Sequence, residues 1–169
     1  MKHLTKNARI QFGALAVERL SEIVYKFSGK YLVYMPTYAA ALEFCFDASL
    51  NKAPKAQIER WLETVETMIP DTEDYSDVLA DQAQCAFIAV YYCLCHILDA
   101  EEKSLNHCIQ KVNEAMDIYG YECGSVDTTG SEQSWQKELT IYFQSTEIAT
   151  TLDLNAIRSI NRQHMIPAV

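Results

Sequence analysis

Glycine and proline are scarce in this chain, which has five glycines and four prolines in 169 residues. Collagen-like repeats and glycine- or proline-rich disordered tracts are therefore excluded. Apolar residues make up 49% of the sequence, and a chain of this length buries roughly two-thirds of the surface that its unfolded form exposes. We find no internal repeat and no linker, and we expect a single domain over residues 1–169.

Motifs that cradle phosphate groups are also missing. The sequence contains neither Gly-x-x-x-x-Gly-Lys nor Gly-x-Gly-x-x-Gly. Histidine occurs only four times, and there is no Glu-x-x-His pair of the kind that di-iron helical bundles use. These absences argue against nucleotide-binding enzymes and di-iron proteins, and we expect no cofactor and no metal.

The chain has no segment that resembles a signal peptide. Its basic first nine residues are followed by an apolar stretch that Gln11, Glu18 and Arg19 interrupt. Most of the cysteines occupy apolar positions of helical patterns, where free thiols behave as small hydrophobic side chains in a reducing compartment. The six are Cys45, Cys85, Cys93, Cys95, Cys108 and Cys123. We therefore expect a cytoplasmic protein without disulfides.

One segment is apolar on every side of a helix. In residues 85–98, only His96 falls outside the apolar and aromatic classes. Such a helix has to be surrounded by other elements. The segment is shorter than the about 20 apolar residues that a membrane span requires, and aspartates flank it at both ends. We predict a buried central helix over about residues 77–98.

Apolar residues recur at three- and four-residue spacing elsewhere, as they do in amphipathic helices. The segments concerned are residues 14–27, 36–50, 54–69, 104–120, 131–148 and 153–160. Residues 31–35 are rich in β-forming side chains, but they have no partner strand, so we expect a helical turn or an extended connector there. The patterns predict the all-α class, as a single-domain bundle of about six or seven helices around the central one.

Two groups of residues resemble a known family. The first comprises Trp61, Glu66 and residues 69–76, which read Ile-Pro-Asp-Thr-Glu-Asp-Tyr-Ser; the second comprises Glu132, Trp135, Gln136, Glu138 and Leu139. Over about residues 40–150 the chain resembles the YjaG-like bacterial family, grouped as domain of unknown function 416. The resemblance implies a compact all-α bundle with an acidic turn ahead of a long buried helix, and it brings no catalytic motif. Residues 34–38 depart from the family pattern, which leaves room for a diverged role.

Negative charge is concentrated in the middle of the chain. Residues 54–102 contain two basic and eleven acidic side chains, so this third alone matches the net charge of −9 of the whole protein. A concentrated negative field repels nucleic acid and anionic lipid and attracts cationic proteins or metal ions. We therefore expect neither a nucleic-acid partner nor a membrane partner.

The acidic residues fall into a helical stripe and a turn. Glu59, Glu63 and Glu66 are spaced at i, i+4 and i+7, which places them on one side of a helix. The turn that follows supplies Asp71, Glu73, Asp74, Tyr75 and Asp77. We predict that these eight residues form a docking surface for a basic protein, with Tyr75 as an aromatic anchor. The function that fits is a non-enzymatic, immunity-type inhibitor that occludes a basic, nuclease-like toxin. The alternative is that the acids are simply the solvated faces of two helices.

Two other functions remain open. Cys93, His96, His107 and Cys108 lie close in sequence, and a small-molecule enzyme or a metal-dependent enzyme could use them. Their spacing is unlike that of structural zinc sites, in which two to four residues separate the paired cysteines of a turn. A helical scaffold that self-associates is the third reading, and the sequence does not decide the oligomeric state.

Overall fold

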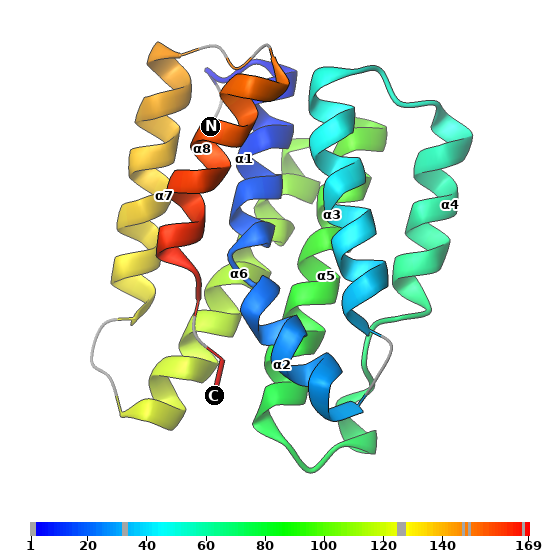
Figure 1. Ribbon diagram of the computed structural model, residues 1–169, viewed down its shortest axis with the longest axis vertical. Helices are drawn as coiled ribbons and strands as arrows, with labels where there is room; N and C mark the ends of the chain where they lie inside the picture. The colour runs from blue at the N-terminus through cyan, green and yellow to red at the C-terminus, as the bar shows by residue number, and fades with distance from the viewer. Residues whose placement is uncertain (1–2, 32–33, 125–127, 147, 149, 167) are drawn as a thin grey trace.

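The computed structural model describes residues 3–31, 34–124, 128–146, 148, 150–166 and 168–169. In these ranges it contains eight α-helices, two short 3-10 helices and no strand (Figure 1). The α-helices are α1 (Lys6–Glu18), α2 (Ser21–Tyr31), α3 (Tyr34–Leu50), α4 (Lys55–Glu66), α5 (Val78–Asp99), α6 (Glu102–Cys123), α7 (Thr128–Ser145) and α8 (Thr151–Asn161). The 3-10 helices are η1 (Thr72–Asp74) and η2 (Arg162–His164). The predicted all-α class is confirmed, and the predicted number of helices is slightly too low.

Helix α5 is the central helix that the sequence predicts. It begins after Asp77, whose side chain accepts a hydrogen bond from the N–H of Leu79 at 3.1 Å. Helices α1, α2, α3, α4 and α6 all pack against it. By length and composition α5 could cross a membrane, but 61% of its most apolar window is buried by the rest of the bundle. Its burial is therefore that of a core helix.

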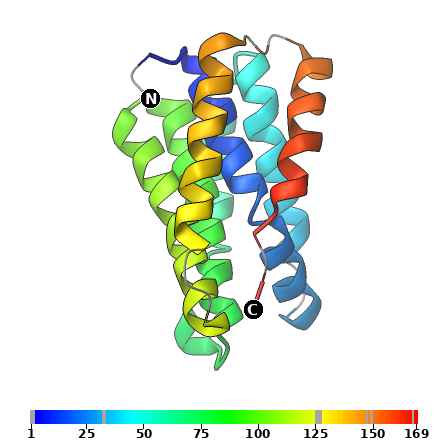
Figure 2. The same cartoon turned by 90° about the vertical axis from the view of Figure 1, so that its left-hand side faces the viewer.

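Helix α1 is enclosed in the same way, which the sequence pattern does not predict. Every residue from Ile10 to Glu18 is buried, because α3, α5, α6, α7 and α8 surround this helix (Figures 1 and 2). Gly13 permits the close approach: a Cβ atom there would lie 3.0 Å from Cδ1 of Leu105 and 3.3 Å from Sγ of Cys93. The polar residues of α1 interrupt its apolar pattern and so conceal its burial.

The additional helix arises because the stripe predicted over residues 14–27 is split into α1 and α2. At the break, the N–H of Leu20 bonds to the carbonyl of Val17 at 2.9 Å. The carbonyl of Arg19 accepts a hydrogen bond from the N–H of Ile166 at 2.9 Å, so the C-terminal segment takes the place of a helical partner. Because Ile166 lies far away in the sequence, no local pattern could reveal this break.

The ends of the C-terminal helices also differ from the prediction. Helix α6 continues through Gly120 to Cys123, and Gly124 follows it with a φ of 61°, the left-handed conformation that glycine adopts readily at helix ends. Helix α8 begins after Thr150, which forms a capping box with Asp153.

Candidate protein-docking surface

Helix α4 lies at an outer edge of the bundle (Figure 1). Its inward side is set by Ile58 and Val65, which are buried, and α4 packs against α3 and α5. The helical period therefore turns Glu59, Glu63 and Glu66 outward, and all three are exposed.

The acidic turn that follows α4 is held by specific hydrogen bonds. Asp71 caps η1, because its Oδ1 accepts a hydrogen bond from the N–H of Glu73 at 3.1 Å. Gln84 of α5 donates to the carbonyl of Pro70 at 2.8 Å and so ties the turn to the central helix. Asp71, Glu73 and Asp74 are exposed. The turn thus carries three further carboxylates directly after the three of α4.

Asp77 is engaged within the fold. Its Oδ1 caps α5, while its Oδ2 accepts hydrogen bonds from Nζ of Lys30 at 2.5 Å and from Oη of Tyr31 at 3.1 Å. The hydrogen bond from Lys30 is the main reason why the pKa of Asp77 is lowered. Because its charge is paired with α2, Asp77 contributes less to a docking surface than the sequence predicts.

Tyr75 is also turned toward the fold. Its hydroxyl lies 2.7 Å from the hydroxyl of Tyr34, and its ring packs edge-on against Phe27 and Tyr31 at centroid distances of 5.2 and 4.7 Å. Burial, together with the hydrogen bond to Tyr75, raises the pKa of Tyr34 to about 12. Tyr75 therefore fixes the turn against α2 and α3, and only its partly exposed portion is accessible to a partner.

The other six predicted residues are outward carboxylates, and we call them the acidic surface: Glu59, Glu63, Glu66, Asp71, Glu73 and Asp74. Glu59 pairs with Lys55 at 3.4 Å. The other five form no ion pair with any residue that the structure describes. An aromatic side chain that the sequence analysis overlooked lies near this surface. This residue is Tyr91 of α5, and its pKa is raised by burial and, to a smaller extent, by the charges of Cys95 and Glu66.

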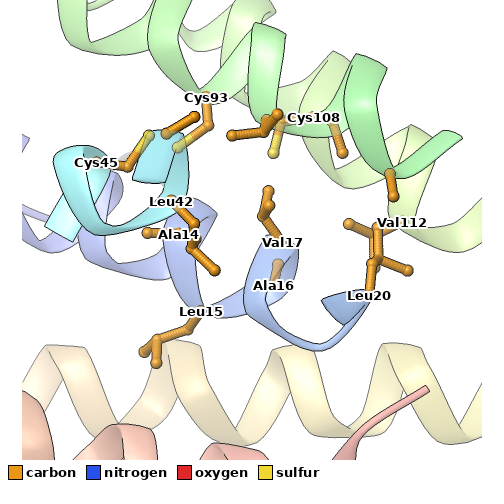
Figure 3. Packing of buried hydrophobic residues seen from close by; sticks show 14 of the residues in the cluster. Ala14, Leu15, Ala16, Val17, Leu20, Leu42, Cys45, Cys93, Cys108 and Val112 are labelled. Atoms are coloured by element: carbon orange, nitrogen blue, oxygen red, sulfur yellow. The ribbon is translucent and has the colours of Figure 1, made fainter. Parts of the chain in front are cut away.

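The cysteines of the alternative site lie in the core. Cys93 and Cys108 are buried, and they gather with Cys45 of α3 beside α1 (Figure 3). Hydrogen bonds with Cys108 and Cys45 lower the pKa of Cys93, whereas contact with Cys93 and burial raise the pKa of Cys45 and of Cys108. These two thiols therefore stay protonated at neutral pH, in the form that is a poor nucleophile and a poor metal ligand.

The two histidines of that site have structural roles in the fold. His96 is fully buried, and its Nδ1 lies 2.8 Å from the carbonyl of Glu101, while its Nε2 has no hydrogen-bond partner among the described residues. His107 packs edge-on against Tyr92 with a centroid distance of 4.9 Å. Among the described residues, no group of three or more histidine, cysteine or acidic side chains is placed to hold a metal ion.

A partly buried ionic network is the main feature that the sequence patterns do not reveal. Arg158 of α8 donates from Nε to Glu18 of α1 at 2.8 Å and from Nη1 and Nη2 to Glu43 of α3 at 2.9 and 2.5 Å. Asn161 donates to the carbonyl of Leu15 at 2.9 Å and to Glu18 at 3.1 Å. The network binds α8 to α1 and α3, which makes it part of the scaffold.

A second buried pair joins α7 to the end of α1. Glu132 is fully buried and accepts hydrogen bonds from Arg19 and from Gln136. Burial raises the pKa of Glu132 and lowers that of Arg19, so desolvation outweighs the mutual attraction of the two charges. The ring of Trp135 stacks on His164 at a centroid distance of 4.0 Å and covers this region. Glu132 and Trp135 belong to the residues that resemble the YjaG-like family, and in this fold both have packing roles.

The chain matches no protein-family model, no curated protein and no solved structure. The resemblance to the YjaG-like family therefore stays a prediction from the sequence.

Proposed function

We propose that this protein is a non-enzymatic, cytoplasmic binding protein whose acidic surface docks a basic protein. The partner class that fits is a nuclease-like toxin, which an immunity-type inhibitor would bind and occlude. One observation carries the proposal: five exposed carboxylates on two consecutive elements have no ion pair to any described residue. Like charges placed together repel one another, and none of these five carboxylates has a described cation within ion-pair distance to offset that repulsion.

The field of such a surface suits a cationic partner. Clustered carboxylates attract lysine- and arginine-rich surfaces over distances of about a Debye length, which is roughly 8 Å at physiological salt. Steering of this kind raises association rates by roughly 10- to 1,000-fold at low ionic strength. A nuclease has a cationic cleft to hold the phosphate backbone, so its active site is the complement of an acidic surface.

The surface is also preorganised. Asp71 caps η1, Gln84 holds Pro70, and Asp77 is locked to Lys30 and Tyr31. A turn that is already ordered loses little conformational entropy on binding, so more of the interaction energy appears as affinity.

Charge reversal with a matched control tests the proposal. Three forms of the tagged protein serve as bait in an extract of the source cell at low and at high salt. They are the unaltered chain, the acidic-surface variant Glu63→Lys/Glu66→Lys/Asp74→Lys, and the control variant Glu22→Lys/Glu122→Lys/Glu138→Lys. Both triple variants change the net charge equally, and the control positions are exposed and lie outside the acidic surface. We expect the unaltered chain and the control to retain the same basic protein at low salt and to release it at high salt.

The acidic-surface variant should lose that protein at both salt concentrations. Circular dichroism of each variant confirms that the fold is kept. Equal capture by all three baits would refute the surface, and capture of an acidic or neutral protein that resists salt would refute the electrostatic mechanism.

A further inference from the structure

A cleft at one end of the bundle is lined by cations. It has a volume of about 480 Å³, within the range of roughly 300–1,000 Å³ that is typical of small-molecule sites. It lies where α1 and α4 begin and where α3 and α5 end, at the upper end of the bundle in Figure 1. Three of its twelve lining residues are lysines, namely Lys6, Lys52 and Lys55, and none is acidic.

This lining is unusual for so acidic a chain. The protein has 23 acidic and 14 basic residues, yet the charged groups that line the cleft are all positive. Lys55 has a partner in Glu59 at 3.4 Å, whereas Lys6 and Lys52 form no ion pair with a described residue. The cleft therefore holds positive charge that the fold itself leaves without a counter-charge.

The floor of the cleft is apolar. Ile10 of α1, Ile58 of α4 and Ile97 of α5 line it together with Leu50 and Leu98. A floor of branched aliphatic side chains accepts a hydrocarbon body, because transfer of apolar surface out of water is favourable. The cationic rim and the aliphatic floor together favour binding of a molecule that has both an anionic group and an apolar part.

Backbone polarity reinforces the rim. Helix α4 begins after Pro54, which makes no side-chain cap, and its first backbone hydrogen bonds are made by the N–H groups of Gln57 and Ile58. The N–H groups of Lys55 and Ala56 precede that ladder, at the positive end of the helix dipole. Helix α1 begins at the same cleft with Lys6. Both helix ends add to the attraction that the lysines exert on an anion.

We propose that this cleft binds a small amphiphile, a molecule with a carboxylate or phosphate head group and a short apolar body. The lysines of the rim hold the head group, and the isoleucines of the floor hold the body. The neighbouring cleft of about 740 Å³ shares Lys6, Asn7 and Leu50, but its only charged lining residue is Lys6, so it lacks this combination. None of the residues of the acidic surface lines this cleft, and the two regions meet where Lys55 pairs with Glu59.

Methyl NMR of the full chain tests this site with defined probes. The probes are octanoate and octyl phosphate. Two control compounds carry one feature each: 1-octanol has the apolar chain but no charge, and inorganic phosphate has the charge but no apolar chain. The methyl groups of Ile10, Ile58 and Ile97 report on the cleft, and those of the exposed Ile141 and Ile160 report non-specific association. We expect saturable shifts at the three cleft methyls with octanoate, octyl phosphate or both, and at least tenfold weaker binding of 1-octanol and of inorganic phosphate. The stronger of the two anionic probes identifies the head group.

Two matched double variants complete the experiment. Lys6→Gln/Lys52→Gln removes two rim charges, and Lys26→Gln/Lys137→Gln removes two exposed charges outside the cleft. The rim variant should bind the anionic probe at least tenfold more weakly, while the control should bind it as the unaltered chain does. The proposal is overturned if neither anionic probe shifts the cleft methyls up to millimolar concentration, or if Ile141 and Ile160 shift equally. Equal binding by 1-octanol, or full affinity in the rim variant, would overturn it too.

Discussion

Asp77 illustrates how a residue predicted for binding is used by the fold. It caps the central helix and receives hydrogen bonds from Lys30 and Tyr31 of α2, so it joins two helices at the end of the acidic turn. The same carboxylate was predicted to face a partner, because its position in an acidic run says nothing about Lys30, which lies 47 residues away.

The charge of Asp77 gives a pH-dependent contribution to stability. Its pKa is lowered in the folded state, so the contribution is fully present above the pKa of the unfolded chain, about 3.9, and is lost as the pH falls through the folded pKa. Asp77→Asn keeps a good cap but loses the charge. We expect the variant to be less stable than the unaltered chain at neutral pH in urea denaturation, with a difference that shrinks below pH 4. A difference that is constant with pH would contradict the assigned role of Lys30.

The two glycines Gly13 and Gly29 allow a matched comparison within helices. A Cβ at Gly13 would lie 3.0 Å from Leu105, whereas a Cβ at Gly29 meets nothing within 4 Å. Gly29→Ala should raise the free energy of unfolding by about 0.5–1 kcal/mol through helix propensity. Gly13→Ala should lower it, because overpacking a filled core costs about 1–3 kcal/mol. Equal effects in chemical denaturation would show that α1 is packed less closely than described.

At the scale of helices, α8 is held by charge rather than by a broad apolar face. Leu154 and Ile157 are buried, but Ile160, within the last predicted amphipathic segment, is 46% exposed. The buried side of the helix is completed by Arg158 and Asn161 instead. The amphipathic pattern therefore locates this helix but misplaces part of its inner face.

Removal of Arg158 should release α8. Arg158→Met leaves Glu18, which is 3% exposed, without its nearest cation, and breaking a buried pair in this way costs about 3–5 kcal/mol. The control is Arg162→Met, since Arg162 contacts the same carboxylate but its side chain is 58% exposed. We expect a large fall in unfolding free energy for the first variant and a change below about 1 kcal/mol for the second. Similar losses in both would mean that Arg162 is the main partner of Glu18.

At the scale of the whole molecule, the features predicted from sequence are the local ones. The central helix over about residues 77–98 and the amphipathic α4 could be predicted, because a helix repeats its environment every three to four residues. The partners of Glu18 could not, because Arg158 is 140 residues away and a buried charge has no periodic signature. The inward placement of Tyr75 was missed for the same reason, since Phe27, Tyr31 and Tyr34 come from other helices.

Charge divides the molecule in a way that supports two separate binding roles. The acidic surface follows the outer side of α4 from Glu59 to the turn after it, while the lysine-lined cleft lies where α4 begins, and the two meet at the pair between Lys55 and Glu59. A protein partner and an anionic small molecule would therefore be drawn to different parts of the fold. Failure of the cleft experiment would leave the docking proposal untouched, and the reverse also holds.

The account depends most on electrostatic docking through the acidic surface, and the association rate with the captured partner measures it directly. We predict that the rate constant of the unaltered chain falls steeply as salt is raised and that the Glu63→Lys/Glu66→Lys/Asp74→Lys variant associates at least tenfold more slowly at low salt. The control with three reversals elsewhere should keep most of the rate. A rate constant that is independent of salt and equal in all three proteins would contradict the account.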